Sequence, residues 1–102
     1  MKNLDELRDH IDRLDNALIY ILAERMSLIP DVARYKAETG TPRYQPSREE
    51  EIISQKRELA KNTGLNPSFV ENIYCLIIAH AHEIEKEIME EWKLIRTYDK
   101  KY

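Results

Sequence analysis

The sequence predicts an all-α protein with three helices per chain, and three observations support this fold class. Glycine occurs only twice and proline four times in 102 residues, so few residues interrupt a helix. The apolar residues of the N-terminal third recur at an alternating three-four spacing, which is typical of a helix with one buried face. β-branched runs are short, and Gly, Pro and Asn clusters divide the chain into three segments, so we expect no sheet.

The first predicted helix is long and runs from Leu4 to about Glu38, with Asn3 as a suitable N-cap and a Gly-Thr-Pro segment after its end. Pro30 lies within this range, where a helix-interior proline costs about 3 kcal/mol. The helix therefore kinks or breaks there, and we expect a kink because the apolar spacing continues beyond it. The apolar positions are Leu4, Leu7, Ile11, Leu14, Leu18, Ile21, Leu28, Val32 and Tyr35.

The second predicted helix begins near Arg48, because Ser47 and Glu50 fit a capping box. It ends at the Asn-Thr-Gly segment 62–64.

The third predicted helix begins at Asn66 and Pro67, which fit a cap and a first turn. We expect this helix to fray after Trp92. The sequence therefore divides into a helical domain of residues 1–92 and a C-terminal tail of residues 93–102.

The length of the first helix predicts the quaternary structure. At 1.5 Å per residue it extends about 52 Å, whereas a compact domain of this size has a diameter of roughly 34 Å. Its apolar face needs a partner along its whole length, and a second copy of the chain supplies one. We therefore expect an intertwined helical homodimer.

Composition excludes several classes of function. The net charge of -3 argues against a nucleic-acid partner. The single Cys75, expected in the core, allows no internal disulfide, and neither a signal core nor a bilayer-spanning run occurs, so we expect a cytoplasmic protein without a membrane partner. His80 and His82 point apart on a helix and are poor metal partners. No phosphate loop or nucleophile-base motif occurs, so we expect neither a metal nor a cofactor.

Three charged residues fall where apolar residues are expected. Arg25 occupies the apolar face of the first helix, and Lys36 projects within about 20° of the same direction. Glu85 lies on the apolar face of the third helix. Buried cations need anionic partners, so one reading is a small-anion site. The alternatives are ion pairs with acids such as Glu24 or Glu50, and a surface position for Glu85.

Arg8 cannot reach the same point from the same chain, because it lies about 100° around the helix from Arg25. In an antiparallel pair of helices, Arg8 of one chain approaches the site of the other. Taken alone, Arg8 is interpreted as a solvated side chain.

These residues lie in recognisable segments: Arg8 in Leu7–Asp15, Arg25 in Leu22–Met26, Lys36 after Val32-Ala33, and the run Pro46-Ser47-Arg48-Glu49. Together, from Leu4 to Trp92, they resemble the all-helical chorismate mutase family. The resemblance implies an intertwined homodimer with two sites. It also implies a cofactor-free isomerase of aromatic amino acid biosynthesis, in the shikimate pathway, that converts chorismate to prephenate.

The same resemblance implies three catalytic residues, Arg25, Lys36 and Glu85. Arg25 of one chain and Arg8 of the partner chain hold the two substrate carboxylates. Lys36 bridges a carboxylate and the ether oxygen, and Glu85 faces that oxygen.

Four further positions are implied to contact or support the substrate. Glu49, with the backbone near Gln45, holds the ring hydroxyl, and Arg48 supports the site. Gln45 stands where related sequences often have Asp, and Ala81 stands where some have Ser, which removes one possible carboxylate contact.

Three other functions fit parts of the pattern. An isochorismate pyruvate-lyase resembles the same family and uses a similar cationic pocket. A non-catalytic helical dimerisation module explains the apolar face but not Arg25 upon it. A regulatory domain that only binds a metabolite is the third alternative.

Overall fold

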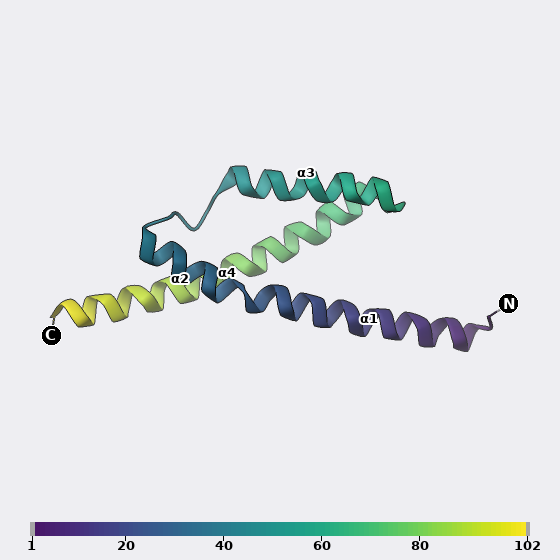
Figure 1. Ribbon diagram of the computed structural model, residues 1–102, viewed down its shortest axis with the longest axis horizontal. Helices are drawn as coiled ribbons and strands as arrows, with labels where there is room; N and C mark the ends of the chain where they lie inside the picture. The colour runs from purple at the N-terminus through teal and green to yellow at the C-terminus, as the bar shows by residue number, and fades with distance from the viewer. Residues whose placement is uncertain (1, 102) are drawn as a thin grey trace.

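The computed structural model describes residues 2–101. Four helical segments follow one another, namely α1 (Leu4–Ser27), α2 (Ile29–Thr39), α3 (Pro46–Thr63) and α4 (Pro67–Lys101). Helices α2 and α3 each pack along α4, whereas α1 leads away from them (Figure 1). No strand occurs among the described residues, and the all-α prediction is confirmed.

Pro30 divides the predicted first helix into α1 and α2, so the chain has four helical segments rather than three. Leu28, between them, keeps helical angles (φ -83°, ψ -20°). Its N–H donates to the carbonyl of Arg25 at 3.3 Å, and its own carbonyl accepts from the N–H of Val32 at 3.2 Å. Pro30 lies in the first turn of α2, where its missing N–H leaves no bond unmade. The interruption is therefore confined to one residue, and α2 continues in nearly the direction of α1 (Figure 1).

Most of the predicted helix ends are confirmed. Asn3 caps α1, since its Oδ1 accepts from the N–H of Glu6 at 2.9 Å. Asn66 caps α4 by accepting from the N–H of Ser68 at 2.8 Å. Gly64 ends α3 with a left-handed φ of 79°, a conformation that strains any residue with a Cβ.

The predicted start of α3 is wrong by two residues. The carbonyl of Gln45 already accepts from the N–H groups of Arg48 and Glu49 at 3.1 and 3.2 Å, and Pro46 occupies the first turn. The pyrrolidine ring fixes φ near the helical value, so the helix begins before Ser47 can act as a cap.

The C-terminal segment does not fray after Trp92, because α4 continues to Lys101. The guanidinium of Arg96 lies 4.8 Å from the centre of the Trp92 ring, one turn away, and this cation-π contact supports the helix past its predicted end. The division into residues 1–92 and 93–102 stays a prediction, and the helix shows no break between them.

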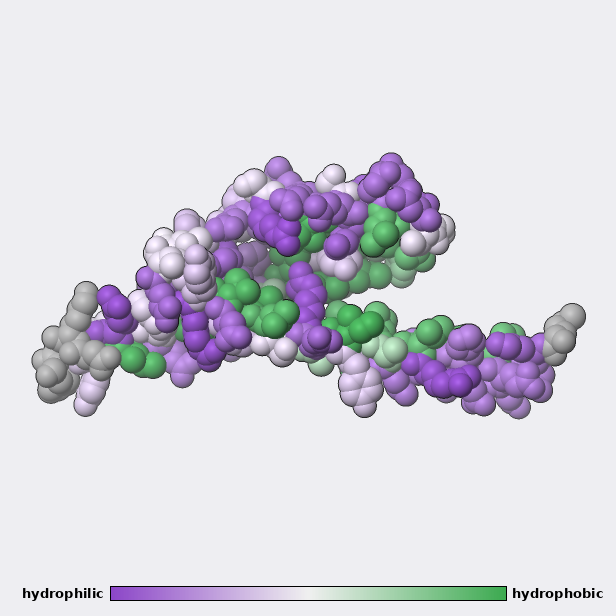
Figure 2. All heavy atoms as spheres, in the orientation of Figure 1, coloured by the Kyte–Doolittle hydropathy of each residue, from purple (hydrophilic) through white to green (hydrophobic). Residues whose placement is uncertain are grey.

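A single chain buries very little apolar surface. Among the described residues, only Ala33, Ala60 and Ala81 are buried apolar residues. The radius of gyration is 18.7 Å, against about 13 Å for a compact domain of this size. Leu14 and Leu18 are 60% and 56% exposed, and apolar surface runs along α1 (Figure 2).

An apolar trough of about 600 Å³ lies between α1 and the α3–α4 pair. Leu18 and Ile21 line it from α1, Leu59 from α3, and Ile73 and Ile77 from α4. Such an apolar trough, open in one chain, has the lining expected of a surface that binds a helix. Within the part of the chain that the structure describes, no helix combines the length and apolar character needed to cross a bilayer.

Candidate active site

A cavity of about 210 Å³ lies where the end of α1, α2, the start of α3 and the middle of α4 meet. It gathers side chains that are up to 60 residues apart in the sequence, because α2 and α3 pack on the same helix. Seven of the eight predicted substrate-binding residues line it: Arg25, Lys36, Gln45, Arg48, Glu49, Ala81 and Glu85.

Lys36 and Glu85 form a buried ion pair across α2 and α4. The Lys36 Nζ lies 2.7 Å from Oε1 of Glu85, and the two side chains are 15% and 6% exposed. The Nζ also donates to the carbonyl of Arg43 at 2.9 Å. A charge-assisted bond of this length is among the stronger kinds. Neither Glu24 nor Glu50 is the partner of Lys36, and Glu85 is not a surface acid.

Two buried polar atoms of the cavity residues have no hydrogen-bond partner, namely Nη1 of Arg25 and Oε2 of Glu49. Leaving a buried charged donor or acceptor unpaired costs more than the roughly 1–3 kcal/mol of a neutral group. One atom can only donate and the other can only accept. The cavity is therefore suited to a ligand that brings an acceptor to Arg25 and a donor to Glu49.

The lining carries an excess of positive charge. Its cations are Arg25, Lys36, Arg43 and Arg48, and its carboxylates are Glu49 and Glu85, which leaves two positive charges with the histidine neutral. The Arg48 side chain is 58% exposed and pairs with Glu51 at 2.8 Å, so its charge lies at the rim. The excess of positive charge suits this cavity to an anionic ligand.

Besides four apolar residues, sequence reasoning missed two charged or polar lining residues, Arg43 and His82. His82 was compared only with His80, as a metal pair. Its spacing of three residues before Glu85, less than one helical turn, was the signal that places both on one face. Arg43 lies in the connection between α2 and α3, where no periodicity indicates a direction. Its Nη1 donates to the carbonyl of His82 at 3.1 Å.

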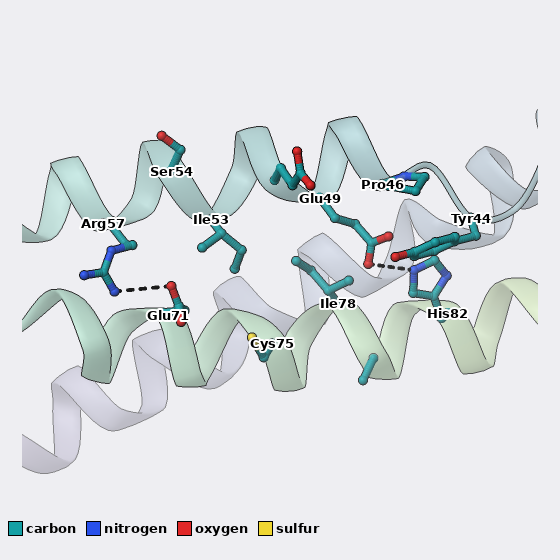
Figure 3. Close-up of a pocket in the computed structure, with 12 residues that line it drawn as sticks. Tyr44, Pro46, Glu49, Ile53, Ser54, Arg57, Glu71, Cys75, Ile78 and His82 are labelled. Carbon is teal, nitrogen blue, oxygen red and sulfur yellow. Dashed lines mark hydrogen bonds and ion pairs between the residues drawn. The ribbon is translucent and has the colours of Figure 1, made fainter.

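Two other predicted positions lie elsewhere. Arg8 is exposed on α1 and is absent from the cavity lining, about 26 Å along the helix from Arg25. Cys75 is exposed, so its predicted core position is wrong. It borders an open groove of about 670 Å³ between α3 and α4 (Figure 3), because no other helix closes that side of α4.

No group of three or more His, Cys, Asp or Glu side chains among those that the structure describes, residues 2–98, is arranged to hold a metal ion. The cavity also offers no Ser, Thr or Cys nucleophile. What it can do chemically is bind a small anion, orient it, and present donors to an atom that becomes negative.

Fold and cavity together define an all-helical protein with a small cavity whose lining carries an excess of positive charge. The model of the chorismate mutase type II family matches residues 7–93. The chain belongs to this family.

Relatives of similar length carry three different names. The chain is 34% identical over 91 residues to a chorismate mutase of Methanocaldococcus jannaschii, covering 89% of this chain and 92% of the relative. It is 33% identical over 91 residues to a 4-amino-4-deoxychorismate mutase of Streptomyces venezuelae, covering 89% and 88%. It is 30% identical over 94 residues to an isochorismate pyruvate lyase of Pseudomonas aeruginosa, covering 91% and 88%.

Proposed function

We propose that the chain is an isomerase that converts chorismate to prephenate in the central cavity, with each site completed by a second copy of the chain. Family membership supports the reaction. The charge of the cavity supports the substrate, because chorismate carries two carboxylates opposite two excess positive charges.

The reaction does not require the protein to form a covalent bond with the substrate. The ether carbon–oxygen bond breaks while a new carbon–carbon bond forms within the same molecule, so no nucleophile or external proton donor is required. The catalyst holds the flexible dianion in a compact conformation and stabilises the negative charge that develops on the ether oxygen. Arg25 binds one carboxylate, since a guanidinium fits it with two parallel bonds. Lys36 and Glu85 face the ether oxygen.

The opposite end of the ligand meets the start of α3. Oε2 of Glu49, which is buried and without a partner, accepts from the ring hydroxyl. The backbone near Gln45 lies beside it, and Arg48 supports the rim. Ala81 is 8% exposed and leaves space where a larger side chain would reduce the small cavity.

A single observation carries this proposal, namely the unpartnered Nη1 of Arg25 in the same cavity as the unpartnered Oε2 of Glu49. A helical module that only dimerises does not need a buried, unpartnered Nη1 of Arg25 or Oε2 of Glu49. Each of these atoms destabilises the empty fold. A ligand with a carboxylate and a hydroxyl satisfies both.

A second copy of the chain is the partner we propose for α1. The exposed apolar residues of α1 and the apolar trough beside it are complementary in character, and antiparallel pairing of two α1 helices covers both. This arrangement also brings Arg8 of each copy toward the cavity of the other, where it holds the second carboxylate. A cytoplasmic location stays a prediction.

The deciding experiment incubates the purified protein with chorismate and with isochorismate in separate reactions. We expect prephenate from chorismate. Salicylate and pyruvate from isochorismate, without prephenate, would instead support the lyase function that the Pseudomonas aeruginosa relative is named for. Calorimetric binding of both compounds without turnover would support a regulatory domain.

A further inference from the structure

We propose that His82 is a positioning residue that makes the cavity prefer a ring hydroxyl over a ring ammonium group. This inference rests on the proposed function and adds a determinant of substrate class to it. His82 lies on α4 and lines the cavity, and its ring meets the carboxylate of Glu49 from α3 (Figure 3).

The imidazole of His82 lies between two carboxylates. Its Nε2 is hydrogen-bonded to Oε1 of Glu49 at 3.1 Å, and its Nδ1 is 3.4 Å from Oε2 of Glu85. Carboxylate oxygens only accept hydrogen bonds, so the hydrogen of the bond to Glu49 is on Nε2. His82 therefore donates to Glu49 and occupies one of its two oxygens.

The surrounding contacts hold the backbone of His82 and place an aromatic ring beside its imidazole. The His82 carbonyl accepts from Nη1 of Arg43 at 3.1 Å, and the Arg43 carbonyl accepts from Nζ of Lys36 at 2.9 Å. The ring of Tyr44 lies 6.0 Å from the imidazole, inclined by 52° (Figure 3). His82 is therefore held from the α2–α3 connection as well as from its own helix, and its 23% exposure leaves it little freedom to turn away.

This geometry determines what Glu49 offers a ligand. His82 takes Oε1, so only Oε2 remains as an acceptor. Glu85 is already paired with Lys36, so no other carboxylate charge is left for the ring substituent. A neutral hydroxyl needs one acceptor and finds it. An ammonium group carries three donors and finds only this one acceptor, so two of its N–H groups stay without a partner there.

The test compares two substrates, chorismate and its analogue with an amino group in place of the ring hydroxyl. The ratio of their kcat/KM values is measured for the wild type, His82→Leu and His82→Gln. We expect the wild type to favour chorismate. His82→Leu should shift the ratio toward the amino analogue by about tenfold, the size of one charged hydrogen bond. His82→Gln, whose amide can still donate one bond to Glu49, should give a smaller shift in the same direction.

The matched control is His80→Leu, because His80 lies on the same helix, is 60% exposed and pairs with Glu83 outside the cavity. It should leave the ratio unchanged. An unchanged ratio in the folded His82 variants, even with slower turnover of both compounds, would overturn the assignment. Should His82→Leu fail to fold by circular dichroism, the near-isosteric His82→Gln decides. Failure of the wild type to convert either compound would instead contradict the proposed function, and this assignment with it.

Discussion

Individual side chains in the cavity divide into those that already have partners and those that lack them. Lys36 and Glu85 satisfy each other at 2.7 Å, whereas Arg25 has a buried Nη1 with nothing to bond. The paired residues maintain the shape of the empty site. The unpaired ones give a ligand most of its favourable contacts, because binding relieves a cost that the fold already bears.

Substitution of Arg25 tests this distinction by thermal unfolding. A stable chorismate-like dicarboxylate, at about 100 times its Kd, should stabilise the wild type by about 2.7 kcal/mol and raise its Tm. Arg25→Ala should abolish the rise. The control is Arg34→Ala, since Arg34 is exposed on α2 and pairs with Asp31. Persistence of the rise in Arg25→Ala would remove Arg25 from the site.

Glu85 gives a prediction about turnover that tests whether its side chain donates to the ether oxygen. A carboxyl group donates a hydrogen bond only when protonated, whereas in the empty site Glu85 accepts from Lys36. If Glu85 donates in the transition state, Glu85→Gln, whose amide also donates, should keep most of kcat. Glu85→Ala, which has no donor, should lower kcat by about 100-fold.

The control for this measurement is Glu83→Gln, because Glu83 is an exposed acid on the same helix, and its kcat should match the wild type. A folded Glu85→Ala variant that keeps the wild-type kcat would show that Glu85 is not a donor. Lys36 would then be the donor to the ether oxygen.

At the scale of the helices, the turns determine whether the cavity closes. Gly40 and Gly64 end α2 and α3 with left-handed φ angles of 71° and 79°. Pro46 and Pro67 begin the next helices. These four residues set where α3 starts and how it returns along α4, and so they place Glu49 opposite His82.

The contribution of a left-handed helix end to the free energy of unfolding can be measured most directly at Gly64. A Cβ built there meets no atom within 4 Å, so Gly64→Ala introduces backbone strain alone, about 1–2 kcal/mol. The free energy of unfolding, measured by denaturant titration at fixed protein concentration, should fall by that amount. For Gly64→Asn the free energy of unfolding should fall less, because Asn adopts left-handed φ angles more readily than Ala. Equal stability of Gly64→Ala and the wild type would contradict the account.

At the scale of the whole molecule, a single chain leaves most of its apolar side chains exposed. No large side chain among the described residues is fully buried, and the molecule extends over 70 × 28 × 15 Å. Hydrophobic burial is the main force that holds a fold together. The elongated shape therefore supports assembly with a second copy, in which the apolar face of α1 and the trough beside it cover each other.

Mixing two inactive variants tests whether the two copies share their sites. Arg8→Ala and Arg25→Ala chains should each lose turnover alone. After joint unfolding and refolding in equal amounts, mixed dimers should carry one site with both arginines, so that about a quarter of all sites are intact under random pairing. The readout is kcat per site, and a mixture of wild type with Arg8→Ala calibrates the exchange. No recovery of activity would contradict the placement of Arg8 across the interface.

Local chemistry was sufficient for the sequence to determine the helices and most of the cavity. Apolar periodicity and the residues Asn3, Gly64 and Asn66 specify elements through bonds made within a few residues, and these predictions were confirmed. Arg25 and Glu85 stood out because a charge on an apolar face needs a partner. Pro46 was misjudged, since a capping box and an N-terminal proline give competing starts for one helix.

Only the tertiary structure decided which charges meet. That Lys36 pairs with Glu85 and not with Glu24 or Glu50, and that His82 joins Glu49 to Glu85, depends on α2 and α3 packing against the same part of α4. Arg43 enters the cavity from a connection without periodicity. Such contacts join residues tens of positions apart, and their geometry is set by helix packing, which a pattern along one chain does not encode.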